Sequence, residues 1–141
     1  MEFISRLLLD IGEGAYVEDP GYVGIQTALI ATGATIVRAP VDEEGLDVDA
    51  IASKKTPTRL VYVSPSHQFP LGITMSLSRR YALLDWACRS NAWILEDDYD
   101  SEFRYGAGAL PCLHGLDPDG RVIYVGTFSK TLFPGLRLVF W

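Results

Sequence analysis

Short, almost wholly apolar runs alternate with amphipathic stretches along this chain, and this alternation constrains the fold more than any other feature. Residues 61–63 and 122–125 have the continuous apolar character of strands that are covered on both faces of a sheet. Residues 77–90, which lie between them, repeat apolar side chains at helical spacing. Strands that alternate with helices form βαβ units and therefore parallel sheets. The sequence thus predicts an α/β fold with a mainly parallel sheet in three α/β/α layers.

The same reasoning applies along the rest of the chain. Gly33 is expected to end one helix, and the Pro-Gly pair at residues 20–21 follows the end of a strand. His114 is expected in a loop rich in Gly, Pro and Asp, with a structural role. The expected helices span residues 3–9, 22–32, 48–54 and 77–90, and the expected strands span residues 15–18, 34–39, 60–63, 92–95 and 122–125, with another beginning at 136.

Composition and charge exclude several classes of protein. The 141 residues, 48% of them hydrophobic, suffice for one domain with its own core. A net charge of −6 argues against nucleic-acid contacts by this segment itself. Cys88 and Cys112 lack the spacing of a metal site, so no metal is expected. No apolar run reaches the length of a membrane span and no signal pattern opens the chain, so a cytoplasmic protein without membrane contact is expected.

Polar clusters follow three of the expected strands, at residues 64–68, 96–102 and 127–130. In parallel α/β sheets, ligands bind beyond the carboxyl ends of the strands. Because those ends meet at one edge of the sheet, we expect the three clusters to converge there. The sequence therefore predicts one ligand site built from three distant segments.

The last of these clusters supplies an amine and groups suited to a phosphate. Lys130 can form an imine with an aldehyde. The hydroxyls of Thr127 and Ser129 and the guanidinium of Arg137 provide the donors that a phosphate needs. The alternative is that Lys130 is an ordinary exposed lysine after a strand, but the presence of Thr127, Ser129 and Arg137 nearby favours a cofactor site. Pyridoxal 5′-phosphate is a cofactor with both an aldehyde and a phosphate.

The second cluster supplies a carboxylate that can keep a pyridine nitrogen protonated. Asp97 is the candidate, although chemistry alone does not separate it from the other acids of the run. Tyr99 can donate to the phenolic oxygen of such a cofactor or pack on the sheet edge, and Tyr22 can stack on its ring or serve as an ordinary aromatic. The other acids that remain possible are Glu96, Asp98, Asp100 and Glu102.

The first cluster contains the only His in the three clusters. His67 can be considered as a general base, but no Ser/His/Asp order or metal spacing supports that role. We expect instead that this loop contacts the ligand through hydrogen bonds, with Gln68 as the candidate residue.

These three motifs together resemble the class I/II aminotransferases of fold type I that use pyridoxal phosphate. More narrowly, they resemble the aminotransferase-like domain of MocR-type regulators in the GntR superfamily. The resemblance covers essentially the whole chain, and it rests on residues 64–72, 96–105 and 122–138.

The resemblance implies a role for each candidate. Lys130 would carry the Schiff base, Asp97 would pair with the pyridinium nitrogen and Tyr99 would meet the phenolic oxygen. Many aminotransferases have an Asn-Pro-x-Gly turn at the position where residues 69–72 read Phe-Pro-Leu-Gly, so Gln68 or His67 is expected to replace the asparagine contact. The phosphate would be held by Thr127, Ser129 and Arg137, and the ring would be covered by Tyr22.

The resemblance also implies a larger protein. Residues 1–141 correspond to the central part of the large domain, and we expect an N-terminal winged helix and a C-terminal small domain outside them. The expected function is effector sensing in a MocR/GntR-type regulator, and the alternative is a free aminotransferase that moves an amino group between an amino acid and a 2-oxo acid. An amino compound as effector or substrate, a homodimer, and DNA contact through the winged helix are implied. Turnover by this segment alone is not expected.

Overall fold

The computed structural model describes residues 1–54, 56–99, 110–127 and 139–140, and these form a seven-stranded sheet in the order β3-β2-β1-β4-β5-β6-β7. The five central strands run parallel, while β3 and β7 pair antiparallel at the two edges. The predicted mainly parallel α/β fold is confirmed. The strands are β1 Gly14–Asp19, β2 Thr35–Asp42, β3 Gly45–Leu46, β4 Thr58–Val63, β5 Trp93–Asp98, β6 Val122–Thr127 and β7 Val139–Phe140.

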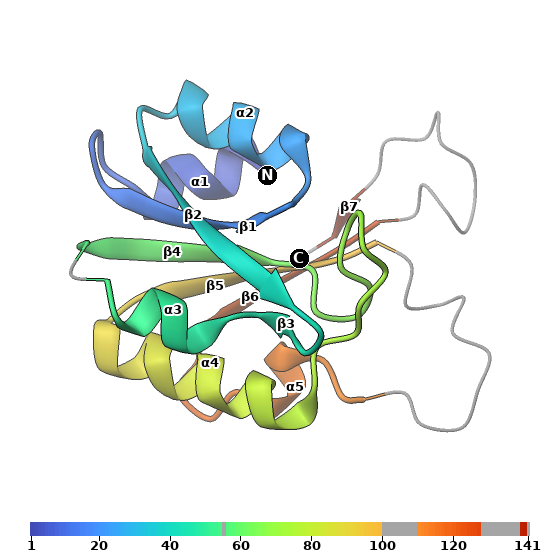
Figure 1. The fold of residues 1–141 in the computed structure, drawn as a ribbon. Helices are drawn as coiled ribbons and strands as arrows, with labels where there is room; N and C mark the ends of the chain where they lie inside the picture. The colour runs from blue at the N-terminus through green and yellow to red at the C-terminus, as the bar shows by residue number, and fades with distance from the viewer. Residues whose placement is uncertain (55, 100–109, 128–138, 141) are drawn as a thin grey trace.

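Helices cover both faces of the sheet (Figure 1). On one face lie α1 (Glu2–Leu8) and α2 (Val23–Ala31), and on the other lie α3 (Val48–Ala52), α4 (Leu77–Ser90) and α5 (Leu113–Leu116). Side chains alternate along each strand, so successive residues enter two separate apolar cores. For example, Val17 belongs to the core under α1 and α2, and Tyr16 belongs to the core under α3 and α4. The predicted three-layer arrangement is therefore confirmed.

Helix α4 shows how local sequence sets an element. The hydroxyl of Ser76 accepts a hydrogen bond from the backbone N–H of Arg79 at 3.2 Å, which caps the first turn. The helix ends at Asn91, whose φ of 51° is left-handed. Leu83 and Ala87 are fully buried against the sheet. The helix spans the residues that its periodicity predicts.

The order of the strands places a topological switch point between β1 and β4. From β1 the chain moves to β2 on one side, and it later returns to pair β4 with the other side of β1. The helices that follow β1 and β4 lie on opposite faces of the sheet, and in parallel α/β sheets this arrangement makes a crevice at the carboxyl edge. Crevices of this kind are where parallel α/β sheets bind ligands. Among the described residues, no helix is long and apolar enough to span a membrane.

Several sequence predictions need correction, and among them β2 and β6 run to Asp42 and Thr127 instead of ending at residues 39 and 125. Strand β5 continues through Glu96 and Asp97 to Asp98, whereas the sequence placed its end at Leu95. His114 lies in the short helix α5 and not in a loop. The hairpin strand β3 was not predicted. The acids remain in the strand because the sheet and its neighbours supply hydrogen-bond partners for them, and local strand propensity takes no account of such partners.

Candidate functional site

Asp97 lies near the carboxyl end of β5 and is held by a tyrosine from the neighbouring strand. The hydroxyl of Tyr62, on β4, donates a hydrogen bond to Oδ2 of Asp97 at 2.5 Å. Tyr62 is only 1% exposed. Burial, together with the nearby carboxylates of Asp97 and Glu18, raises the pKa of the Tyr62 phenol far above its ordinary value. Tyr62 therefore remains a hydrogen-bond donor at physiological pH and fixes one oxygen of Asp97.

The acids on either side of Asp97 belong to the opposite face of the sheet, because side chains alternate along a strand. Glu96 is fully buried and accepts hydrogen bonds from two backbone N–H groups of α5, at 2.8 and 2.9 Å. Burial raises the pKa of Glu96. Asp98 accepts a hydrogen bond from the hydroxyl of Tyr124 at 2.9 Å. Glu96 and Asp98 are thus buried on the opposite face, whereas Asp97 is only partly buried, and this difference favours Asp97 as the acid that meets a ligand.

A second buried carboxyl group, Glu18 of β1, joins the two loops of the switch point. Its Oε2 accepts hydrogen bonds from the hydroxyl of Ser64 at 2.7 Å and from the backbone N–H of Ser64 at 3.3 Å. The side-chain amide of Gln68 approaches the same oxygen at 3.4 Å. Burial above all, with the charge of Asp97 as a smaller contribution, raises the pKa of Glu18 to about 7. A carboxyl group that titrates near neutrality inside a ligand crevice is typical of a functional site.

The side chain of Gln68 is engaged with the protein's own groups. Its amide nitrogen donates to the backbone carbonyls of Pro20 and Phe69, each at 2.8 Å, and its oxygen accepts from the backbone N–H of Leu71 at 3.1 Å. Gln68 therefore ties the loop after β4 to the turn after β1. A direct contact between Gln68 and a cofactor stays a prediction.

Aromatic side chains surround this edge of the sheet. The hydroxyl of Tyr99 donates to the backbone carbonyl of His67 at 2.8 Å, and the two rings lie 6.0 Å apart. Tyr22, at the start of α2, meets Phe69 edge to face at 6.2 Å between ring centroids. Gly21 permits the close turn between β1 and α2, because a Cβ at that position would collide with the carbonyl oxygen of Glu18. Two aromatic pairs thus flank the crevice, one from each side.

Thr127 is the last residue of β6 and is half-buried, at the same edge of the sheet as Asp97. Its proposed phosphate contact stays a prediction. The other predicted residues of this part of the site, and two of the alternative acids, lie outside the described residues: Ser129, Lys130, Arg137, Asp100 and Glu102.

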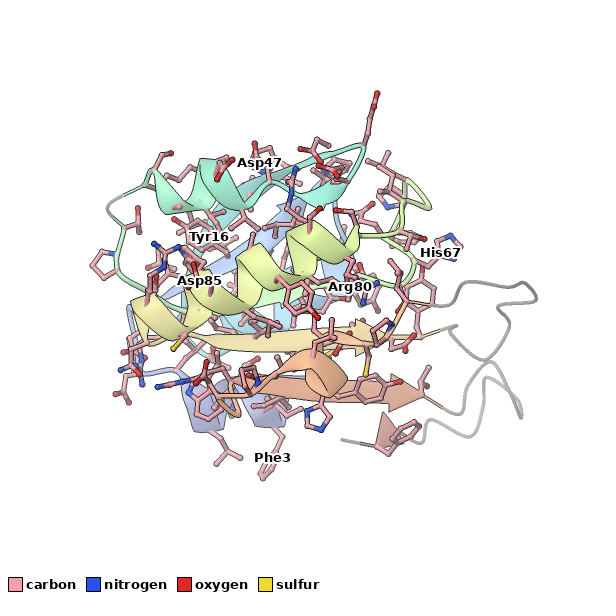
Figure 2. The ribbon with its side chains drawn as sticks, turned by 90° about the horizontal axis from the view of Figure 1, so that it is seen from below. Phe3, Tyr16, Asp47, His67, Arg80 and Asp85 are labelled. Carbon is pink, nitrogen blue, oxygen red and sulfur yellow. The ribbon has the colours of Figure 1, made fainter. Side chains whose placement is uncertain are left out.

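Arg80 is a residue whose importance sequence reasoning missed. An arginine in an amphipathic helix is expected on the solvent-facing side, but Arg80 is fully buried. Its guanidinium donates to the backbone carbonyls of Pro65 at 2.9 Å and of Met75 and Pro111 at 3.1 Å. Figure 2 shows Arg80 in the first turn of α4, with His67 near the same end of the sheet. The guanidinium of Arg80 therefore holds together the loop after β4, the segment just before α4 and the segment before α5.

Sequence signals existed for some of these residues. Arg80 stands at the start of the buried stripe 83, 84 and 87, at helical spacing from each. Glu18 is an acid at the end of a buried apolar strand, where only the exposed Asp19 follows it. Tyr62, by contrast, lies inside an apolar strand and has the sequence context of an ordinary core residue.

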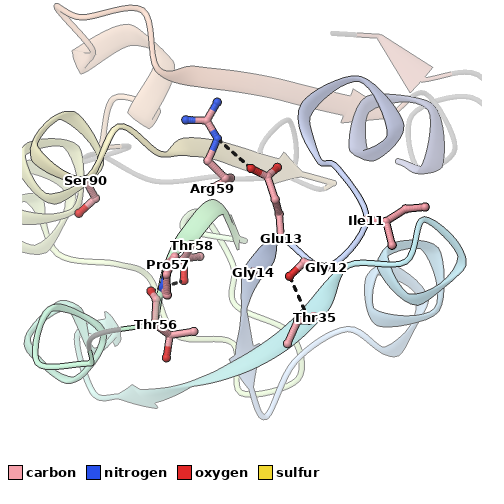
Figure 3. A pocket seen from close by; sticks show the side chains of 10 residues that line it. All are labelled: Ile11, Gly12, Glu13, Gly14, Thr35, Thr56, Pro57, Thr58, Arg59 and Ser90. Atoms are coloured by element: carbon pink, nitrogen blue, oxygen red, sulfur yellow. Dashed lines mark hydrogen bonds and ion pairs between the residues drawn. The ribbon is translucent and has the colours of Figure 1, made fainter.

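A hollow on the described surface lies elsewhere, at the amino edge of the sheet (Figure 3). It has a volume of about 500 Å³. Glu13 and Arg59 face each other across it at 3.6 Å, and each side chain is about a third exposed. None of the predicted site residues lines it. Its lining consists of Ile11, Gly12, Glu13, Gly14, Thr35, Thr56, Pro57, Thr58, Arg59 and Ser90.

Comparison with known proteins gives a consistent result. The sequence profile of the family "Aminotransferase class I and II" matches residues 1–140. The chain is 45% identical over 140 residues to the probable rhizopine catabolism regulatory protein MocR of Rhizobium meliloti, and the match covers 99% of this chain and 28% of the relative. It is 42% identical to the HTH-type transcriptional regulator TauR of Rhodobacter capsulatus, over 95% of this chain and 27% of the relative.

The solved structure of LysN, the alpha-aminoadipate aminotransferase of Thermus thermophilus complexed with N-(5′-phosphopyridoxyl)-L-leucine, superposes with a TM-score of 0.89. That match has 34% sequence identity and covers 98% of this chain and 37% of the LysN chain. The described chain thus spans less than a third of the two regulators and little more than a third of the enzyme. The resemblance stated from the three motifs is confirmed.

Proposed function

Because this chain belongs to the class I and II aminotransferase family, we propose that it forms the pyridoxal-phosphate-binding core of the effector-sensing domain of a MocR-type transcription regulator. The observation that carries the proposal is the hydrogen bond between Tyr62 on β4 and Asp97 on β5, at the carboxyl edge of the sheet and next to the switch point. It presents a fixed carboxylate where a parallel α/β sheet receives its ligand.

The described residues fit such a cofactor. A pyridine nitrogen stays protonated beside a carboxylate, and Asp97, with Glu18 nearby, makes this crevice acidic. Tyr62 orients Asp97, and Tyr22 offers an aromatic ring that is half exposed. When bound, pyridoxal phosphate supplies an aldehyde that accepts an amine and a ring that withdraws electrons. Lys130 would be its covalent anchor, and Thr127, Ser129 and Arg137 would hold its phosphate.

The regulator is favoured over a free aminotransferase by sequence identity. MocR and TauR are 45% and 42% identical to this chain, and LysN is 34% identical. In the complete protein we propose that an amino compound binds at the cofactor and that a helix-turn-helix segment outside these residues contacts DNA. A homodimer located in the cytoplasm is part of the same proposal.

The test uses the complete gene product. Added pyridoxal phosphate should give a protein-bound absorbance band, and an amine from a panel should change the affinity for the DNA upstream of the gene. The matched variants are Asp97→Asn, which should weaken the band, and Asp98→Asn, which should not. Steady 2-oxo acid formation without DNA binding would support the free aminotransferase. A protein that binds no pyridoxal phosphate would overturn both functions.

A further inference from the structure

The described hydrogen bonds to the Glu18 carboxyl group reach only one of its two oxygens. The residue is 1% exposed, and all three of its donors reach Oε2. Within the described residues, its other oxygen, Oε1, is buried and has no hydrogen-bond partner. An ionised carboxylate with one oxygen buried and unsatisfied is much more costly than the neutral acid. The geometry therefore favours a protonated Glu18 in the unliganded protein.

The groups that face Glu18 come from each element around it. Ser64 and Gln68 approach from the loop after β4, and both stabilise the ionised form. Asp97, on β5, is the charged neighbour, and it opposes ionisation. Tyr62, on β4, has its pKa raised by both carboxyl groups, and its hydroxyl donates a hydrogen bond to Asp97. The buried Glu18 and the partly buried Asp97 therefore lie close enough for their charges to interact, and a single negative charge is tolerated there more easily than two.

We infer that Glu18 is a positioning residue of the cofactor site, a neutral acid in the unliganded protein that loses its proton when a pyridinium cation binds Asp97. The inference rests on the proposed function. A positive charge at Asp97 offsets the second negative charge, so the O–H bond of Glu18 breaks and the proton passes to the solvent. The carboxylate then accepts stronger hydrogen bonds from Ser64 and Gln68, which tightens the two loops that border the crevice.

The inference predicts that cofactor binding releases protons from Glu18, and this release can be measured. Calorimetric titration of the complete apoprotein with pyridoxal phosphate, in two non-amine-reactive buffers of different ionisation enthalpy, gives the number of protons exchanged. Wild type should release more protons than Glu18→Gln at pH 6, by a measurable fraction of a proton, and the difference should fall to near zero at pH 8.5, above the pKa of about 7. Glutamine keeps the size of the side chain and an oxygen that accepts from Ser64.

Two further measurements distinguish the possible failures. Ser64→Ala removes the shortest donor to the ionised form, so it should move the pH at which the difference disappears to a higher value. Infrared spectra of wild type should show a protonated-carboxyl band that declines when the cofactor binds, whether or not Glu18→Gln folds. Equal proton counts in wild type and Glu18→Gln, or an unchanged infrared band, would overturn this inference and leave the proposed function standing. Absence of pyridoxal phosphate binding to wild type would overturn the proposed function itself.

Discussion

The two edges of the parallel sheet are both polar, but they hold their polar groups in different ways. At the carboxyl edge, Glu18, Ser64 and Gln68 are each about 1% exposed and interlock through hydrogen bonds. At the amino edge, a hollow of about 500 Å³ is lined by groups that water reaches, and its ion pair between Glu13 and Arg59 is partly exposed. A search for a ligand site by the size of a hollow would therefore select the amino edge, whereas a search by the burial of polar groups selects the carboxyl edge.

Burial is the better guide here, because desolvation changes what a group can do. A carboxyl group in water keeps its ordinary pKa, and its hydrogen bonds compete with water. Burial raises the pKa of Glu18 to about 7 and keeps Tyr62 a donor to Asp97. A ligand at the carboxyl edge can therefore change the charge and orientation of these groups. If this is correct, substitutions at the carboxyl edge should alter cofactor binding and substitutions at the amino edge should not.

The largest effect should follow the loss of the amine. Lys130→Ala should abolish covalent attachment of pyridoxal phosphate, because no other amine is expected at this position. Borohydride reduction of the complete protein, followed by peptide mapping, should place the cofactor on the peptide that contains Lys130. Lys54→Ala is the control, since the Lys54 ammonium already donates to the backbone carbonyl of Arg38. A label on Lys54 or Lys55 would show that the assignment is wrong.

A large but partial effect should follow the loss of the central acid. Asp97→Ala removes a charge-assisted hydrogen bond worth about 1.5–3 kcal/mol, so affinity for pyridoxal phosphate should fall about ten- to a hundredfold. Equilibrium titration of cofactor absorbance measures this loss. Asp98→Ala is the matched control, because Asp98 bonds to Tyr124 and belongs to the other face of the strand. If Asp98→Ala weakened binding and Asp97→Ala did not, the wrong acid would have been chosen.

A smaller effect should follow the loss of the orienting hydroxyl. Tyr62→Phe preserves the ring and its packing, but it removes the hydrogen bond from the tyrosine hydroxyl to Oδ2 of Asp97. The loss of one hydrogen bond of about 1 kcal/mol should weaken pyridoxal phosphate binding about fivefold. Tyr124→Phe removes the corresponding hydroxyl from Asp98 and should leave cofactor affinity unchanged. Equal losses in the two variants would indicate a general loosening of the sheet.

The sequence predicted the fold better than it predicted the site. Helix α4 has a capping serine, a left-handed asparagine and a regular apolar stripe, so its bounds were predicted correctly. The end of β5 was predicted wrongly because Glu96 and Asp98 are stabilised by partners on α5 and β6 that are remote in sequence. Local propensity contains no information about such partners.

The same limit explains what was missed in the site. The position of Asp97 after an apolar run makes it a candidate, but the sequence makes the neighbouring acids equally plausible. The structure separates them, because β5 continues through all three acids and places Asp97 on the opposite face from Glu96 and Asp98. Tyr62 has the sequence context of an ordinary core residue, and only the register of β4 against β5 brings its hydroxyl to Asp97. Residues whose role depends on pairing between strands cannot be found from local pattern alone.

The smallest effect should come from the amino edge. Arg59→Met keeps most of the apolar stem but removes the ion pair with Glu13, which spans 3.6 Å and is partly exposed. Exposed pairs of this kind contribute about 0.2–1 kcal/mol and weaken with salt. We therefore expect a change of at most about 1 kcal/mol in the free energy of unfolding, smaller at high salt, and no change in affinity for pyridoxal phosphate.

The measurements are urea unfolding at low and high salt and cofactor titration of the same protein. Arg59 also donates to the backbone carbonyl of Asn91 at 2.9 Å, and Arg59→Lys retains a cation that can keep that contact. A loss of stability in Arg59→Met that Arg59→Lys restores, without salt dependence, would assign the effect to Asn91 and not to Glu13. A clear drop in cofactor affinity in either variant would show that the amino edge is coupled to the crevice, and burial would then no longer separate the two edges.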